Sequence, residues 1–165
     1  MPRIGKENGM IDSKWFLMGD TEAMAEAWTI RDKVFIQEQG FSRETERDGV
    51  DAAATHLLIR DGGIPVATGR LYRRDDGRYF IGRVAVLPEF RRQHLGDLLM
   101  RMLIRRARNL GAGDVWVDSQ SQAVPFYTAL GFTRQDEGHL DEGVLHYFMR
   151  LPAEKEPPRC CEGRQ

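Results

Sequence analysis

The chain has 165 residues, of which 41% are hydrophobic and 30% charged, and its formal net charge is -1. This length and composition predict one domain with a sizeable core, and the balanced charge excludes a global field that would favour nucleic acid or a membrane surface as partner. The sequence has no apolar run long enough to span a membrane and its first residues lack the apolar core of a signal peptide, so we expect a cytoplasmic protein.

The two ends of the chain are expected to lie outside the domain. Residues 1–13 form a polar, flexible lead and residues 153–165 a disordered tail, which leaves 14–152 as the folded domain. The only cysteines, Cys160 and Cys161, are adjacent in this tail. Adjacent cysteines have the spacing of neither a metal site nor a disulfide framework, so we expect no metal.

The first half of the chain is predicted to contain one long helix among strands. A strand at 14–18 precedes Asp20, which stands where a helix N-cap would stand, and apolar residues at helical spacing predict a helix up to Gly40. The stretch 42–53 mixes four acidic residues with arginines and has little periodicity, so it is predicted to be an exposed loop beside a site. Turn signals and alternation then predict an antiparallel meander. Its three strands are 55–60, 64–74 and 78–87.

In the second half, helices alternate with strands. Apolar residues at helical spacing predict a helix from Leu95 to Leu110, which the tripeptide "GAG" ends. A strand follows at 114–119, and a short helix at 122–130 begins near a proline. The dipeptide "GF" and the segment 144–151 are predicted as the last strands. The whole pattern indicates a mixed α/β (α+β) domain.

The turn before the helix from Leu95 carries two adjacent arginines, Arg91 and Arg92. It lies at a helix N-terminus, where unpaired backbone N–H groups and the helix dipole favour a phosphate. Neither a Walker loop nor a G-x-G-x-x-G dinucleotide motif is present. The turn therefore indicates a local anion site, although an arginine pair at a helix start is also an ordinary solvated feature.

Two blocks of the sequence carry a resemblance to a known family. "GRVAVLPEFRRQHLGDLLM" and "SQSQAVPFYTALGF" resemble the signature blocks of the GNAT superfamily of acyl-CoA-dependent N-acyltransferases, and the likeness extends over 14–151. "RDKVFIQEQG", "THLL" and "DEGVLHYFM" add a likeness to a bacterial branch of small acetyltransferases of undefined substrate. The resemblance implies a single GNAT-like domain, with a twisted, mostly antiparallel sheet of about six or seven strands, about four flanking helices, and a splay between the fourth and fifth strands.

The resemblance also implies where acetyl-CoA binds. The family's phosphate loop has the pattern Q/R-x-x-G-x-G/A. Its places are occupied here by Arg91, Arg92, Gln93, His94, Leu95 and Gly96, with Asp97 next. A side chain at His94, where glycine is usual, crowds the backbone, but histidine tolerates positive φ better than most residues and its ring can donate to a phosphate. The other implied contacts are strand residues that hold pantetheine and a side chain that is usually asparagine in relatives. These are Val84, Ala85 and Val86 in the strand, and Gln120.

The implied reaction is direct attack of an amine on the thioester of acetyl-CoA, without an acyl-enzyme. Tyr127 in "PFYTALGF" matches the family's tyrosine and is the candidate general acid, because a phenol can protonate a thiolate leaving group of comparable basicity. Phe126 beside it is assigned to packing. The base stays open. Its candidates are Glu38, Glu46, Asp48, Asp51, Asp118 and His146.

Some charged residues admit two interpretations. Arg83 stands in a strand where many relatives with a carboxylate base have a glutamate nearby. It either binds an acid on the substrate or pairs with the acidic stretch 42–53. Arg31, within the apolar stripe of its helix, has the same two interpretations. His56 is a strand residue whose ordinary role is hydrogen-bonded packing.

The sequence therefore predicts an acetyl-CoA-dependent N-acetyltransferase that acts on a small-molecule or peptide amine, with no nucleic acid and no membrane as partner. Two alternatives stay open. One is a catalytically weak acyl-CoA-binding sensor, for which His94 and the missing strand glutamate argue. The other is an interaction module that pairs through a sheet edge and has no affinity for CoA. A homodimer is compatible with each, since superfamily members often pair through their sheets.

Overall fold

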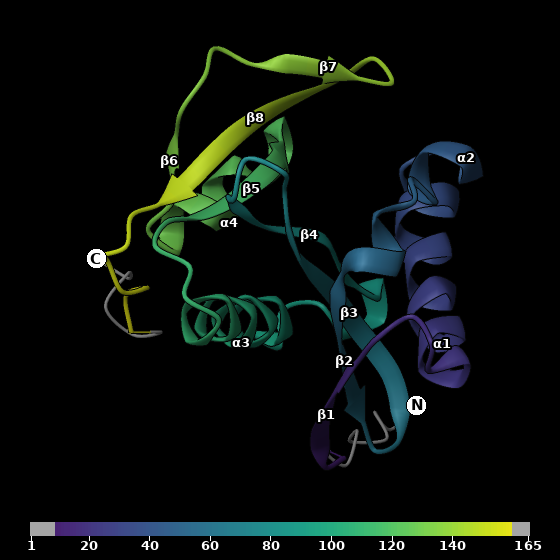
Figure 1. Cartoon of the computed structure of the whole chain (residues 1–165). Coiled ribbons are helices and arrows are strands. Elements are labelled where there is room, and N and C mark those ends of the chain that lie inside the picture. Colours follow the sequence, from purple (N-terminus) through teal and green to yellow (C-terminus); the bar gives the residue numbers. More distant parts are fainter. Residues whose placement is uncertain (1–8, 160–165) are drawn as a thin grey trace, which may run out of the picture.

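The structure is a computed structural model, and it describes residues 9–159 (Figure 1). Its strands are β1 (Ile11–Phe16), β2 (Thr55–Asp61), β3 (Ile64–Arg73), β4 (Tyr79–Val86), β5 (Val115–Gln120), β6 (Thr133–Arg134), β7 (His139–Asp141) and β8 (Val144–Leu151). Its α-helices are α1 (Thr21–Arg31), α2 (Arg43–Glu46), α3 (Leu95–Asn109) and α4 (Val124–Ala129). A π-helical segment covers Asp32–Glu38, and short 3₁₀ turns cover Val50–Ala53, Pro88–Phe90 and Ser121–Ala123. Within this part of the chain, no helix has the length and apolar character needed to cross a membrane.

All the strands belong to one mixed sheet with the order β1-β2-β3-β4-β5-β8-β6, and β7 pairs with β8. Every pairing is antiparallel except that of β4 with β5, which run parallel. The parallel ladder joins only residues 79–81 to residues 115–117, and beyond it the two strands separate. The predicted mixed α/β fold with its mostly antiparallel, splayed sheet is thus confirmed, with one short strand, β7, that the sequence did not predict.

A β-bulge bends the end of β4. The register between β3 and β4 shifts between Thr68 and Arg70, which leaves Arg83 and Val84 of β4 opposite Gly69 alone. Arg83 has a φ of +49°, in the left-handed region. A bulge of this kind bends and twists its strand, and the bend contributes to the separation of β4 from β5.

Helices α1 and α3 cover opposite faces of the sheet (Figure 1). In β2, Leu57 and Ile59 pack in the cluster under α3, whereas Leu58 between them packs under α1. This alternation is expected of a strand that is buried on both faces. Helix α3 approaches β3 so closely that a Cβ at Gly69 would lie 2.8 Å from a methyl carbon of Leu103, and that side chain would have to shift to admit it.

The first long helix begins as predicted and then changes its winding. The Asp20 carboxylate caps α1 by accepting a hydrogen bond from the Ala23 backbone N–H at 3.1 Å. After Arg31 the chain continues as π-helical turns, which the hydrophobic period did not indicate. Gly40, with a φ of +79°, follows the run and lets the chain leave it.

The stretch 42–53 is not the exposed loop that its charge predicts. It forms α2 and a 3₁₀ turn, and its Glu46 and Asp51 side chains are buried. Both carboxylates pair with Arg31 of α1, which is 1% exposed, and Arg70 of β3 lies 2.9 Å from the Asp51 carboxylate. Burial disfavours the ionised form of Asp51, but Arg31 and Arg70 outweigh that effect and hold its pKa well below the usual range. Most of the stretch stays at least partly exposed, but these two carboxylates can be buried because arginines pair with them.

Arg83 extends this network to β4. Its guanidinium donates to the backbone carbonyls of Thr45 at 3.0 Å and Glu46 at 3.3 Å, and it lies 3.1 Å from the Asp48 carboxylate. Of the two interpretations of Arg83 and Arg31, the structure therefore shows ion pairing with the acidic stretch. We call the six side chains the buried ion network. Its members are Arg31, Glu46, Asp48, Asp51, Arg70 and Arg83.

The boundaries of the domain differ from the predicted ones. Strand β1 begins at Ile11, so the end of the predicted lead 1–13 belongs to the sheet. Residues 153–159 of the predicted disordered tail lie against α3 and form hydrogen bonds with it. Cys160 and Cys161 lie outside the described residues.

We expect Arg31→Met to lower the free energy of unfolding by about 3–5 kcal/mol, because two buried carboxylates lose a partner. Arg43→Met is the matched control, since that side chain is 69% exposed and its ion pair with Asp32 spans 3.6 Å. Its loss should be at most about 1 kcal/mol. Urea unfolding followed by circular dichroism at pH 7 measures both variants. Equal losses would contradict the energetic importance of the buried ion network.

Candidate functional site

A cavity of about 820 Å³ lies where β4 and β5 separate. Residues from β4, the start of α3, β5, α4 and the β7–β8 hairpin line it. We name its two ends by the elements that form them. The phosphate-turn end is lined by Arg91, Arg92, residues 94–97, Phe126, Pro158 and Arg159. The hairpin end is lined by Thr45, Glu46, Arg83, Asp118, Asp141 and His146.

The phosphate-turn end is built on the N-terminus of α3. Arg92 and His94 both have left-handed φ values, +65° and +60°, so histidine adopts the positive φ expected at this place. No side chain caps α3, and Leu98 donates the first helical hydrogen bond, to the carbonyl of His94. The N–H groups of residues 95 and 96 therefore precede the first helical hydrogen bond, and a helix terminus of this kind can bind an anion.

Gly96 and Phe126 form one wall of this end. A Cβ at Gly96 would lie 3.4 Å from the ring of Phe126, so nothing larger than a methyl group fits without narrowing the cavity. Phe126 is 37% exposed and lines the cavity, which its assignment to packing did not anticipate. No local pattern indicates this role, because adjacent aromatic residues in a short helix are ordinarily packing residues.

The guanidinium of Arg91 already forms hydrogen bonds with other residues of the chain. Its guanidinium donates to both carboxylate oxygens of Glu38, at 2.8 and 2.9 Å, and to the carbonyl of Val86 at 3.0 Å. Such a two-pronged arginine–carboxylate pair is among the stronger side-chain interactions. Glu38, one of the candidate bases, is thereby held by Arg91 and is not among the residues that line the cavity.

Tyr127 lines the cavity from α4. It is 9% exposed, and its ring packs edge-on against Phe126 and Phe132 at centroid distances of 5.1 and 5.9 Å. Burial raises the pKa of its hydroxyl well above the usual value. The phenol therefore keeps its proton throughout the neutral range, as a general acid requires.

The side chain of Gln120 links β5 to the chain that follows the π-helical segment. At the end of β5, its Nε2 donates to the side-chain oxygen of Gln39 at 2.7 Å, and its own side-chain oxygen accepts from Gln122. Both Gln39 and Gln120 line the cavity. The bridge ties β5 to the chain that follows the π-helical segment and narrows the opening between them.

Two titratable side chains face the hairpin end from β5 and β8. His146 is 6% exposed, and its Nδ1 lies 2.9 Å from the carbonyl of Val144. A carbonyl only accepts, so Nδ1 carries a proton, and in the neutral ring the lone pair is then on Nε2. The Asp118 carboxylate lies 2.9 Å from Nε2 of His139. Burial disfavours the charged form of His139, but the carboxylates of Asp136 and Asp118 outweigh it and raise the pKa.

The candidate bases fall into two groups. Those that line the cavity are Glu46, Asp118 and His146. Glu38, Asp48 and Asp51 do not line the cavity, and each of them is paired with an arginine. Glu46 is itself fixed by Arg31. The geometry therefore favours Asp118 and His146.

The predicted cofactor residues come together around this one cavity. All of them line it except Gln93, which is exposed and is not among the lining residues. Residues 84–86 belong to the part of β4 that lies beyond the ladder with β5, so no strand pairs with that edge. Over the described range 9–159, no three His, Cys, Asp or Glu side chains lie close enough to hold a metal ion.

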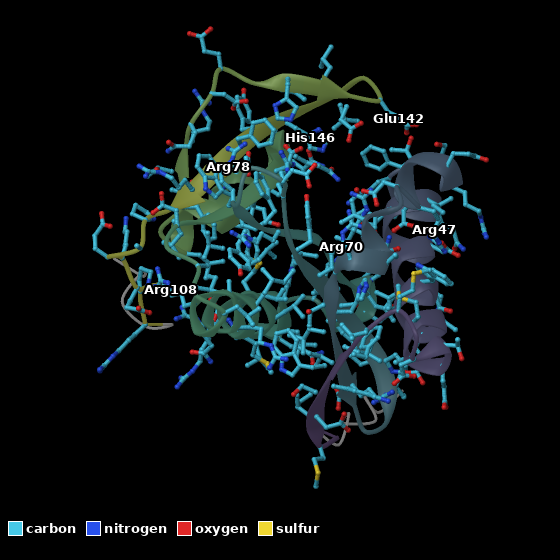
Figure 2. The ribbon with its side chains drawn as sticks, in the orientation of Figure 1. Arg47, Arg70, Arg78, Arg108, Glu142 and His146 are labelled. Atoms are coloured by element: carbon cyan, nitrogen blue, oxygen red, sulfur yellow. The ribbon has the colours of Figure 1, made fainter. Side chains whose placement is uncertain are left out.

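The tip of the β7–β8 hairpin is tied to α2 (Figure 2). Glu142, with a φ of +46°, accepts hydrogen bonds from the hydroxyl of Ser42 at 2.9 Å and from the hydroxyl of Thr45. These hydrogen bonds lower the pKa of the Glu142 carboxyl. Two segments about a hundred residues apart thus meet beside the hairpin end and partly close it.

Comparisons with known proteins agree with this geometry. The family model described as "Acetyltransferase (GNAT) family" matches residues 22–132. "Uncharacterized N-acetyltransferase YjcF" of Bacillus subtilis is 33% identical over 129 residues, which cover 78% of this chain and 91% of that protein. An acyl-CoA N-acyltransferase from Pseudomonas aeruginosa is similar in structure, with a TM-score of 0.76 and 26% identity over 86% of this chain and 99% of that one. Escherichia coli ElaA shares the fold, with a TM-score of 0.76 at 24% identity over 86% of this chain and 99% of that one.

We expect Glu142→Ala to loosen the hairpin, because two hydroxyl groups lose their acceptor. Amide hydrogen exchange in residues 139–146, measured by mass spectrometry at pH 7, should become about tenfold faster. Glu142→Gln keeps an acceptor oxygen and is the matched control, with exchange close to wild type. Unchanged exchange in the alanine variant would show that this contact does not hold the hairpin.

Proposed function

Since the chain belongs to the GNAT family of acetyltransferases, we propose that it transfers an acetyl group from acetyl-CoA to a primary amine of a small molecule or a peptide. Family membership makes it an acyltransferase with an acyl-CoA donor. One observation carries the finer proposal. A single cavity joins the uncapped N-terminus of α3 to the buried hydroxyl-bearing ring of Tyr127.

The residues of the cavity fit CoA. At the phosphate-turn end, the N–H groups of residues 95 and 96 and the guanidinium of Arg92 would hold the pyrophosphate. The free edge of residues 84–86 offers backbone donors and acceptors to the amide groups of pantetheine. Gln120, across the gap, would hold the same portion from β5.

The side chains around the cavity can supply both proton transfers. When bound, acetyl-CoA supplies a thioester whose carbonyl carbon accepts the amine nitrogen while the carbon–sulfur bond breaks. Tyr127 gives its hydroxyl proton to the departing sulfur as the carbon–sulfur bond breaks. His146 takes the proton of the attacking amine on Nε2, with Asp118 as the alternative base.

The hairpin end favours an amine as the acceptor. Asp118 and Asp141 line it and attract a cationic group, while His146 receives the proton that the amine must lose before it attacks. Arg83 is occupied by Asp48 and by backbone carbonyls, so it is not the partner for an acid on the substrate. A cytoplasmic location and the pairing of two copies stay predictions.

Thermal unfolding with and without acetyl-CoA tests the cofactor site. Ligand at about 100 times its Kd stabilises the folded state by about 2.7 kcal/mol, which corresponds to about 5–10 °C for a chain of this size. We expect Gly96→Glu to abolish this rise, because it places bulk and negative charge beside the N–H groups of α3. Gly19→Glu is the matched control, since a Cβ there meets nothing within 4 Å and the residue does not line the cavity.

Each result of this experiment has a definite meaning. A rise in wild type and in Gly19→Glu, lost in Gly96→Glu, supports the proposed site. No rise at millimolar acetyl-CoA in wild type contradicts it and favours the interaction module. A rise without CoA release from any amine in a panel of spermidine, tyramine and a lysine-containing peptide favours the acyl-CoA sensor.

We expect Tyr127→Phe to lower kcat about 100-fold with the fastest amine of that panel, because the general acid is lost. The KM for acetyl-CoA should stay within about threefold, since the ring and its packing remain. Tyr147→Phe is the control, because Tyr147 does not line the cavity. The rate at which the CoA thiol is released gives kcat and KM for wild type and for both variants. A kcat that falls no more in Tyr127→Phe than in Tyr147→Phe would remove Tyr127 from the mechanism.

A further inference from the structure

The segment after β8 returns across α3 and is fastened to it by arginines of that helix. Arg108 donates to the carbonyls of Pro152 at 3.1 Å and Lys155 at 2.5 Å, and to the carboxylate of Glu156 at 2.7 Å (Figure 2 labels Arg108). Further along the same helix, Arg101 donates to the carbonyl of Pro158. Polar composition predicted disorder here, yet these hydrogen bonds give residues 152–158 a defined course.

This course ends at the cavity. Pro158 and Arg159 line its phosphate-turn end, next to Gly96, Asp97 and Arg101 of α3. The covalent order of CoA runs from the thioester through pantetheine and pyrophosphate to the 3′-phosphoadenosine. With the thioester near Tyr127 and the pyrophosphate at the start of α3, the part of the cavity beyond the turn is left for the phosphoadenosine.

The other arginines at this end already have partners or an assigned role. Arg91 is paired with Glu38, at 2.8 and 2.9 Å, and Arg92 is assigned to the pyrophosphate. Arg101 lies 2.7 Å from the carboxylate of Asp97, which itself repels an anion. Arg159 also lines this end with an exposed side chain, and it belongs to a segment outside the part that the family model matches.

We propose that Pro158 and Arg159 form a subsite for the 3′-phosphate of CoA, in which Arg159 is the cation that binds it. This inference rests on the proposed cofactor site. The arginines of α3 fix the backbone of the segment, and so less conformational freedom is lost when the phosphate binds than a free tail would lose.

Isothermal titration with CoA and with 3′-dephospho-CoA tests the subsite without need of an acceptor amine. Wild type should bind CoA more tightly than 3′-dephospho-CoA. Arg159→Ala should weaken CoA binding about tenfold, as expected for one charge-assisted hydrogen bond, and leave the affinity for 3′-dephospho-CoA unchanged. Arg159→Lys keeps the charge and should retain most of the preference. Arg105→Ala, an exposed residue of α3 that does not line the cavity, should bind both ligands as wild type does.

The other outcomes overturn the subsite. Equal weakening of both ligands by Arg159→Ala would place Arg159 elsewhere on the cofactor, and no change would show that it does not touch the cofactor. Tighter binding in Arg159→Ala would mean that the segment obstructs the cavity. If wild type binds neither ligand, the proposed function fails together with the subsite. If the subsite alone is wrong, wild type still binds CoA.

Discussion

Strands β4 and β5 keep their parallel hydrogen bonds only over residues 79–81 and 115–117, and the site depends on the loss of the rest. A backbone group that is removed from water without a partner costs free energy, so the edges beyond this ladder must face solvent, side chains or a ligand. The bulge at Arg83 and Val84 bends β4 where pairing ends. The chain then enters α3 within a few residues, so the free strand edge and the uncapped helix N-terminus open onto the same cavity.

The buried ion network fixes the position of α2 beside this opening. It places charges of both signs in a region that apolar side chains would otherwise fill, and such pairs gain little net stability over an apolar core. Here these pairs fix the position of α2 relative to β4. Arg83 reaches from the bulge of β4 to the carbonyls of Thr45 and Glu46, so α2 is held against the strand. Ser42 and Thr45, at and within helix α2, in turn donate hydrogen bonds to the Glu142 carboxylate of the hairpin.

The parts of the structure that local patterns encode could be predicted from the sequence. The apolar period of α3 predicts the helix, and the arginines before it lead to the proposal of an anion site at its start. The positive φ of His94 follows from its place in the phosphate loop and from the tolerance of histidine for that conformation.

The parts that depend on distant partners could not be predicted. Glu46 and Asp51 lie in a stretch with the composition of a solvated loop, and their burial depends on Arg31 of α1 and Arg70 of β3, which are distant in the sequence. Arg91 is engaged by Glu38, which lies 53 residues earlier in the chain. The course of the tail depends on arginines of α3 that precede it by more than 40 residues.

The chain therefore fixes the two ends of its cavity by different means. Backbone N–H groups and a strand edge form the end proposed to bind the acetyl donor, and these depend on the course of the chain more than on side-chain identity. Histidine can stand at position 94, where glycine is usual, without loss of the turn for this reason. The end proposed for the acceptor is built from side chains of α2, β5 and the β7–β8 hairpin, which lie partly outside the matched family segment. Substitutions there alter charge and shape directly, so relatives that share the reaction are free to differ in the amine they accept.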